Sequence, residues 1–265
     1  VGLVTYRETL LLLDPKTAPV RNRYASISVN SHELAHMWFG NLVTPAWWDD
    51  LWLNEAFATW MASRTVADVA PELQADLDAV ARANGVMNSD SRKATRAIRQ
   101  PITHGGDVYN AFDGITYSKG ASVLAMIESW IGEEAFRQGV RSYLAEAAYA
   151  TGRTDELLAA REKSSGKPVT SVLTNFIDQP GTPLLDVKVR CDGEKVFVEL
   201  AQSRYLPAGS DAQHGQPWRV PVCMKYEVEG QIKRQCVDLD AKKKSFALNA
   251  GVCPTWLHPN ADERG

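Results

Sequence analysis

One short motif constrains this chain more than any other feature: His32-Glu33-Leu34-Ala35-His36, with eighteen residues between His36 and Glu55. On a helix, residues four apart project from nearly the same face. Two neutral imidazoles at that spacing can hold one Zn²⁺, and a second helix can return Glu55 as a third ligand. Three protein ligands leave one tetrahedral position open for water, which is typical of a catalytic zinc site rather than a structural one.

Glu33 follows the first histidine and is predicted to be the general base. A zinc-bound water is far more acidic than bulk water, so a neighbouring carboxylate can take its proton at neutral pH and later pass it to a leaving amine. Attack on a peptide carbonyl produces an oxyanion, which the metal and a second donor would stabilise. The residues therefore predict a zinc hydrolase. A solvated helix that carries two histidines by chance is the plain alternative for the motif taken alone.

The residues around the motif are similar to those of a known family. The stretch from Ser31 to Ala58 contains WFGNLVT after the second histidine and WLNE-x-FA around Glu55. It resembles the zinc aminopeptidases of the aminopeptidase N and leukotriene hydrolase type, which are gluzincins. The resemblance covers nearly the whole chain and is densest over 26–61 and 112–121. It implies peptide substrates that lose their N-terminal residue, and one Zn²⁺ per chain at His32, His36 and Glu55.

The same resemblance implies a role for Tyr117. Judged by its surroundings alone, a tyrosine at the start of an apolar helix is more often a packing residue. The family's catalytic tyrosine lies in a Tyr-x-Lys-Gly-Ala context, which Tyr117 to Ala121 reproduces. Tyr117 is therefore predicted to donate a hydrogen bond to the oxyanion. Asp50 and Asn54 flank the third ligand and are candidates to orient the ligands, with helix capping or solvation as the alternative.

One element of the family pattern is missing. In the resembled enzymes a GxMEN segment comes immediately before a stretch like Gly2 to Glu8 and helps to bind the substrate's α-ammonium, but this chain has no such segment. We expect the chain to be part of a longer enzyme with additional N- and C-terminal domains. We also expect it to bind zinc and to show weak or no aminopeptidase activity alone.

Other functions stay open beside the aminopeptidase. A bifunctional epoxide hydrolase uses the same scaffold, and nothing in the segment selects for it. The spacing would also suit a thermolysin-like endopeptidase, although WFGNLVT favours the aminopeptidase branch. A non-catalytic scaffold or binding relative would not need three intact ligands, a base and a tyrosine. The net charge of −3, with no basic stripe, gives no reason to propose nucleic acid, and the absence of a long apolar run predicts no membrane span.

Hydrophobic periodicity changes from helical to alternating close to residue 181, which divides the chain. The predicted fold is α+β: a mostly helical, thermolysin-like zinc catalytic domain over 1–181, with its N-terminal part missing, and a small β-sandwich over 182–265. The helical segments are expected from about 26 to 40, around Glu55, from Pro71, from 110 to 149 with a break at Gly132, and at 153–163 and 168–177. Residues 1–13 are expected to form a strand.

All four cysteines lie in the predicted β part, and none is near the motif histidines, His32 and His36, in the sequence. Cys223 and Cys236 are symmetric about a hairpin turn at 229–231, so a disulfide between them is geometrically conceivable, and Cys191–Cys253 would then complete the pairing. Four buried thiols in a reducing cytosol are the alternative. Oxidation would place the enzyme outside the cytoplasm, in the periplasm or secreted, and this location is slightly favoured over the cytoplasm.

Overall fold

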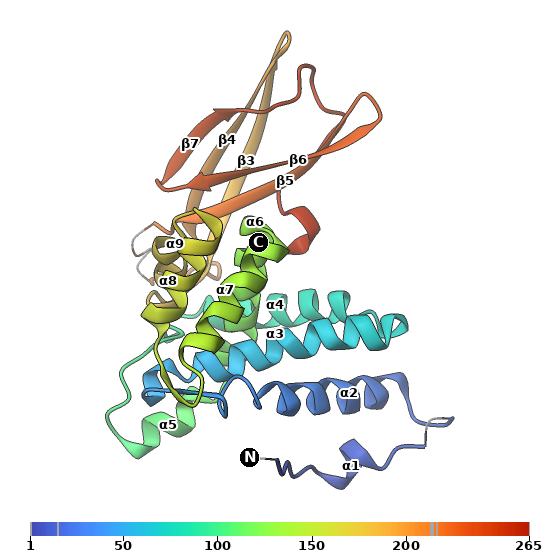
Figure 1. Ribbon diagram of the computed structural model, residues 1–265. Coiled ribbons are helices and arrows are strands. Elements are labelled where there is room, and N and C mark those ends of the chain that lie inside the picture. Colours follow the sequence, from blue (N-terminus) through green and yellow to red (C-terminus); the bar gives the residue numbers. More distant parts are fainter. Residues whose placement is uncertain (1, 15, 213–214, 216, 265) are drawn as a thin grey trace.

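The computed structural model describes residues 2–14, 16–212, 215 and 217–264, with helices in its first part and strands in its last (Figure 1). Its α-helices are α1 Glu8–Leu11, α2 Val20–Ala35, α3 Trp52–Val69, α4 Ala75–Asp90, α5 Gly105–Ala111, α6 Gly120–Ile131, α7 Glu133–Glu146, α8 Thr154–Ser165 and α9 Val169–Ile177. Short 3₁₀ turns lie at η1 Trp48–Asp50, η2 Pro71–Leu73 and η4 Ala261–Glu263, and a π-turn, η3, spans Ile115–Lys119.

Within the described residues, the strands form three small sheets. They are β1 Val43–Pro45, β2 Ala150–Gly152, β3 Pro183–Asp192, β4 Lys195–Arg204, β5 Val220–Val228, β6 Gln231–Leu239, β7 Lys243–Ala247 and β8 Trp256–His258. The short β1 and β2 pair in parallel within the helical part. After α9, the strands form two antiparallel sheets, in the orders β3-β4-β7 and β6-β5-β8. The chain is therefore a mixture of helix and sheet, with the change of type between Ile177 and Pro183.

Helix α3 is central to the helical part, where it contacts both α2 and α6 (Figure 1). Ala56 and Phe57 on α3, and Leu124 and Ile127 on α6, are all fully buried. Small and apolar side chains at helical spacing give α3 the buried face that its sequence predicts. Because that face begins in the first turn of α3, packing of the core also fixes the position of Glu55.

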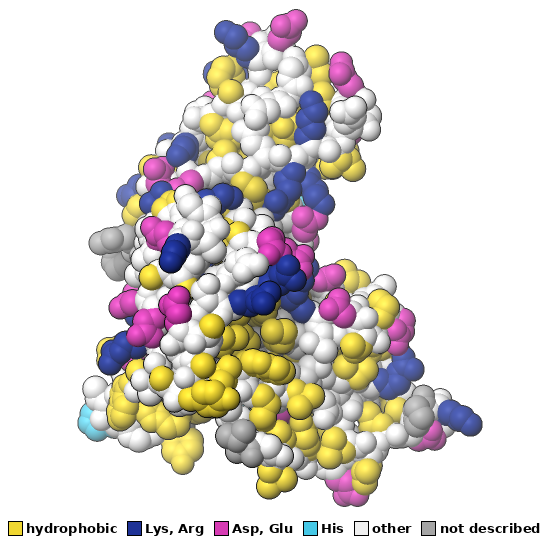
Figure 2. Space-filling view, viewed as in Figure 1, with side chains coloured by type: hydrophobic (Ala, Val, Ile, Leu, Met, Phe, Trp, Pro, Cys, Tyr) yellow, Lys and Arg dark blue, Asp and Glu magenta, His cyan; other side chains and the backbone are white. Residues whose placement is uncertain are grey.

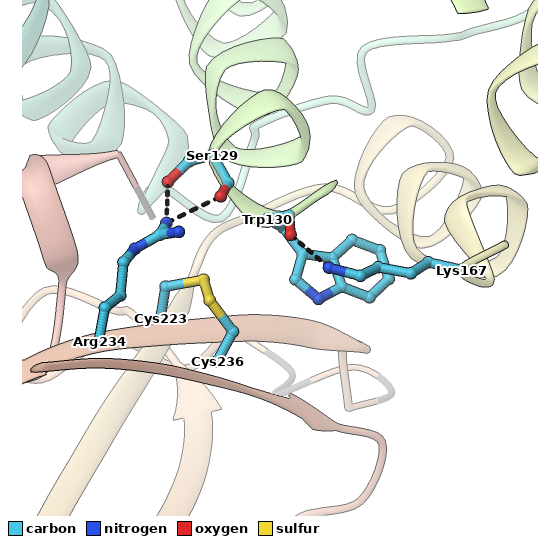
Figure 3. Close-up of a disulfide and its surroundings, with 6 residues drawn as sticks. All are labelled: Ser129, Trp130, Lys167, Cys223, Arg234 and Cys236. Atoms are coloured by element: carbon cyan, nitrogen blue, oxygen red, sulfur yellow. Dashed lines mark hydrogen bonds between the residues drawn. A yellow bond between two sulfur atoms is a disulfide. The ribbon is translucent and has the colours of Figure 1, made fainter. Parts of the chain in front are cut away.

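The hairpin between β5 and β6 fixes one disulfide. Glu229 and Gly230 connect the strands with positive φ angles of 53° and 79°, the backbone that two-residue hairpins require. The resulting register places Cys223 directly opposite Cys236, and the two are bonded (Figure 3). Cys191 is bonded to Cys253. Both pairings that the sequence made conceivable are thus formed.

Two cations bind the C-terminal end of α6, one from the β part and one from the loop between α8 and α9. The Arg234 guanidinium of β6 donates hydrogen bonds to the Ser129 carbonyl at 2.8 Å and to Ser129 Oγ at 2.7 Å (Figure 3). Lys167 donates to the Trp130 carbonyl at 2.5 Å. These cations satisfy carbonyl groups of the last turn of α6, which have no partner within the helix.

Three sequence-based expectations were wrong in detail. The strand expected over 1–13 is an irregular segment with one helical turn, α1, and no described strand pairs with it; Val1 lies outside the described residues. An extended segment is not stable as a strand without a partner for its backbone groups. The histidine-bearing helix begins earlier, at Val20 after Pro19, and ends at Ala35. Pro71 opens η2, and α4 starts only at Ala75.

Apolar and charged side chains gather on different parts of the surface. Figure 2 shows hydrophobic side chains gathered over the helical half of one face, with charged side chains concentrated where the β part meets it. Trp47, Trp48, Tyr109 and Phe112 are among the exposed large apolar residues. Within the described part of the chain, every helix is too short or too polar to cross a bilayer.

Candidate metal centre

The predicted ligands come together where α2 and α3 lie side by side. His32 is in the last turn of α2, His36 caps its C-terminal end, and Glu55 is in the first turn of α3. One ligand atom from each lies within 4.8 Å of the others. Glu55 is buried, and the two histidines are partly buried. The structure therefore assembles a compact two-nitrogen, one-oxygen cluster from residues 23 positions apart in sequence.

The spacing of the three donor atoms fits a tetrahedral metal. His32 Nε2 lies 3.1 Å from His36 Nε2 and 3.2 Å from Glu55 Oε2, and His36 Nε2 lies 3.5 Å from the same oxygen. Two ligands that each bind a tetrahedral Zn²⁺ at about 2.0–2.1 Å are about 3.3 Å apart. All three edges of the cluster are close to that value, so these residues can hold such an ion with little rearrangement.

Neighbouring groups orient both imidazoles. His36 Nδ1 donates to the Phe39 carbonyl at 2.9 Å, which leaves the Nε2 lone pair free for a metal. The Thr59 hydroxyl donates to the Glu55 carbonyl at 2.7 Å and lies 3.4 Å from His32 Nδ1. Sequence analysis did not identify Phe39 or Thr59. Thr59 could have been found, because it follows Glu55 by four positions on one helix; the Phe39 carbonyl carries no side-chain signal.

The cluster keeps the Glu55 carboxylate ionised. Burial favours the neutral form, but hydrogen bonds from His32 and His36 and their charges outweigh burial and lower the pKa of Glu55 to about 2. For His36, burial favours the neutral ring, whereas the Glu55 carboxylate, the Phe39 carbonyl and Glu33 shift its pKa upward overall. An anionic third donor suits a divalent cation.

Tyr117 lies against the same cluster, and Glu33 is close to it. The Tyr117 ring stacks on His32 with centroids 5.9 Å apart and planes 22° from parallel. Burial raises the pKa of the Tyr117 phenol, and the negative charges of Glu55 and Glu33 raise it further. The phenol is therefore protonated at neutral pH and can donate a hydrogen bond. Glu33 is near enough to influence both Tyr117 and His36.

Asp50 and Asn54, the two candidates to orient the ligands, have other neighbours in the fold. Asp50 is buried and accepts hydrogen bonds from the backbone N–H and hydroxyl of Thr154, so it caps α8. The Asn54 amide lies against Gly40, where an added Cβ would be 3.1 Å from Asn54 Nδ2. Gly40 has a φ of 132°, which explains a glycine at this position. The capping alternative holds for Asp50.

Comparison with known proteins identifies the family. The family model described as "Peptidase family M1 domain" matches residues 1–176. The chain belongs to peptidase family M1. Among curated family M1 relatives, it is 36% identical to aminopeptidase M1 of Arabidopsis thaliana over all of this chain and 31% of that protein. It is 38% identical to the alanine/arginine aminopeptidase of Saccharomyces cerevisiae over 93% of this chain and 28% of that one.

An archaeal protein gives a similar match. The tricorn protease-interacting factor F2 of Thermoplasma volcanium is 35% identical over 94% of this chain and 31% of its own length. This family M1 chain thus spans about a third of the length of the relatives it matches. The His32, His36 and Glu55 cluster and Tyr117 all lie within the matched residues 1–176.

Proposed function

We propose that this chain carries the catalytic centre of a zinc aminopeptidase, which removes N-terminal amino acids from peptides. His32, His36 and Glu55 bind one Zn²⁺, Glu33 is the general base, and Tyr117 stabilises the oxyanion. The observation that carries the proposal is the spacing of the three donor atoms, 3.1 to 3.5 Å, beside a protonated tyrosine. The names of two relatives, both aminopeptidases, support the substrate class.

In the proposed peptide hydrolysis, each group of the site has a role that follows from its charge or its proton. A bound Zn²⁺ supplies a Lewis acid that acidifies water and polarises a carbonyl group. Glu33 takes the proton of the attacking water and delivers it to the leaving amine. The Tyr117 hydroxyl donates a hydrogen bond to the oxygen that becomes negative as the carbonyl carbon turns tetrahedral. The Phe39 carbonyl and Thr59 hold the imidazoles in place during these steps.

The architecture of the proposed enzyme has two parts. Residues 1–181 form a thermolysin-like catalytic domain, and residues 182–265 form a β-sandwich from the two three-stranded sheets. The end of α9 at Ile177 and the start of β3 at Pro183 support the boundary. The greater length of the relatives supports further domains in the parent enzyme. Two disulfides support a location outside the cytoplasm.

The chain alone is expected to show weak or no aminopeptidase activity, so the test uses the longer parent enzyme proposed above. It compares Glu33→Gln with the unchanged enzyme, both loaded with zinc. Hydrolysis of leucine anilide should fall by about 10²- to 10⁴-fold, because the base is lost while the ligands remain. The matched control is Glu146→Gln on the exposed surface of α7, which should keep the rate. N-acetylated leucine anilide should not be cleaved by any of the three. An unchanged rate in Glu33→Gln, or equal cleavage of the acetylated substrate, would refute the proposal.

A further inference from the structure

A buried ion pair lies two residues from Tyr117. Asp90 ends α4 and is 0% exposed, and Lys119 ends η3 and is 5% exposed. Lys119 Nζ lies 2.8 Å from Asp90 Oδ2. Removing two charges from water costs several kcal/mol per ion, and well-packed hydrophobic residues often give the same stability or more. Stability alone is therefore a weak reason for this pair.

The pair holds the connection between the helical and β parts. Asp90 Oδ1 accepts a hydrogen bond from the Gly181 N–H at 3.0 Å, and Asp90 Oδ2 accepts one from the Thr182 hydroxyl at 2.8 Å. Lys119 donates to the Gly181 carbonyl at 2.9 Å. Both polar groups of the Gly181 backbone are thus bound by the two members of one ion pair. The linker between α9 and β3 is fixed directly to η3.

Tyr117 lies in the middle of that π-turn. Single π-helical turns are rare and are frequent at functional sites. The wide turn places one side chain where a regular α-helix would not. At its N-terminal side, the Arg96 guanidinium donates to Thr116 Oγ1 at 2.8 Å and to Asp113 Oδ1 at 2.5 Å. A shift of one residue in helical register turns a side chain by about 100°. If the loss of an anchor allowed the π-turn to refold as a regular α-helix, the Tyr117 phenol would therefore move away from His32.

We propose that the Asp90–Lys119 ion pair is a positioning element for Tyr117, which fixes the π-turn to the Gly181–Thr182 linker. Through it, the linker and the sheets beyond determine where the phenol lies over His32. The inference deepens the proposed function, on which its catalytic meaning rests. Neither Asp90 nor Lys119 contacts the reacting atoms in this account; both act through Tyr117.

Fluorine NMR of the whole chain with fluorinated tyrosine tests the proposal without any need for turnover. The Tyr117 line is identified by its loss in Tyr117→Phe. In the unchanged chain it should move when Zn²⁺ is added. Asp90→Asn should reduce that movement more than twofold while zinc still binds at the same ratio. In the zinc-free chain, Asp90→Asn should shift the Tyr117 line but leave the line of Tyr226, which is buried in β5.

Two further variants separate positioning from general stability. Thr182→Val keeps both charges and removes one donor to Asp90, so it should give the same pattern with a smaller amplitude even if Asp90→Asn fails to fold. Asp238→Asn breaks the ion pair between Arg219, which precedes β5, and Asp238 of β6, and it should leave the Tyr117 line unchanged. The proposal is overturned if Asp90→Asn and Thr182→Val leave the zinc-free Tyr117 line in place, or move all tyrosine lines alike. If the unchanged chain binds no zinc, the proposed function is refuted instead. The comparison of the zinc-free chains still shows whether Asp90 positions Tyr117.

Discussion

His32 Nε2 and His36 Nε2 lie 3.1 Å apart, although the helix that carries the first histidine ends before the second. His36 keeps helical dihedrals, φ −61° and ψ −17°, and its N–H still bonds to the His32 carbonyl. The chain leaves the helix only after this residue, which allows the Phe39 carbonyl to turn back onto His36 Nδ1. The end of the helix thus supplies an orienting group that a continuous helix would not.

Replacing Tyr117 with phenylalanine should remove one oxyanion donor and leave the metal in place. We expect kcat to fall by about 10²- to 10³-fold with little change in KM, because the hydrogen bond strengthens only as charge develops. Steady-state kinetics of the longer parent enzyme on leucine anilide, with zinc content measured in parallel, check this. Tyr109→Phe is the control, since Tyr109 is 84% exposed. A loss of zinc in Tyr117→Phe, or an equal loss in both variants, would argue against the assigned role.

Gly120 allows the π-turn to approach α3 closely. A Cβ at this position would lie 2.6 Å from the Cβ of Ala56, the neighbour of Glu55. Gly120→Ala should therefore lower the free energy of unfolding by about 1–3 kcal/mol through overpacking. The control is Gly85→Ala in α4, where the added Cβ would meet open space. This substitution should raise the free energy of unfolding by about 0.5–1 kcal/mol. Urea unfolding measures both, and a neutral Gly120→Ala would mean that the helices are not in contact here.

The two disulfides should differ in their contribution to stability. Cys191–Cys253 closes a separation of 62 residues and Cys223–Cys236 one of 13. The chain-entropy estimate gives about 4 kcal/mol for the longer loop and about 3 kcal/mol for the shorter one. Replacing each pair with alanine and measuring urea unfolding checks the order. A larger loss from the hairpin pair would show that local geometry outweighs loop length.

The Asp90–Lys119 pair should make stability depend on pH in the acidic range. Burial favours the neutral carboxyl, but the charge and hydrogen bond of Lys119, with Thr95 and Thr182, hold the pKa of Asp90 below its usual value. A lowered folded-state pKa stabilises the fold above the unfolded pKa of about 3.9 and less as pH falls below it.

The comparison with Asp90→Asn isolates this contribution. At neutral pH the unchanged chain should be more stable by about 3–5 kcal/mol, because the variant leaves Lys119 buried without its counter-ion. The difference should shrink as pH falls below about 4. Urea unfolding of both chains over this range gives the result. A difference that stays constant or grows toward acid would contradict the direction of the pKa shift.

The sequence predicted most helices, and it predicted that His32, His36 and Glu55 lie together, since both follow from local spacing. Glu55 lies in the first turn of a helix with a buried face, as its neighbours indicate, and Gly132 separates α6 from α7 as expected. The role of Asp50 was not predictable in the same way, because its partner Thr154 lies 104 residues away. Residues 2–13 have strand-like composition, yet a strand is defined by a partner, which local sequence does not reveal.

The π-turn at Tyr117 was not predictable from the sequence either. Its residues, Ile115–Lys119, continue the helical pattern of α6, and hydrophobic spacing does not distinguish a π-turn from an α-turn. Its long-range contacts join Lys119, at its C-terminal end, to Asp90 and Gly181, and Thr116, near its start, to Arg96. Features that depend on buried polar groups far apart in sequence require the folded structure.

The metal content of the purified chain tests whether His32, His36 and Glu55 bind zinc. The measurement uses the unchanged chain, Glu55→Ala and Glu33→Gln after dialysis against trace zinc at neutral pH. We expect about one zinc per chain in the first and in Glu33→Gln, and a loss of zinc in Glu55→Ala, because Glu55 is a proposed ligand and Glu33 is not. No zinc in the folded, unchanged chain, or full zinc in Glu55→Ala, would contradict this proposal.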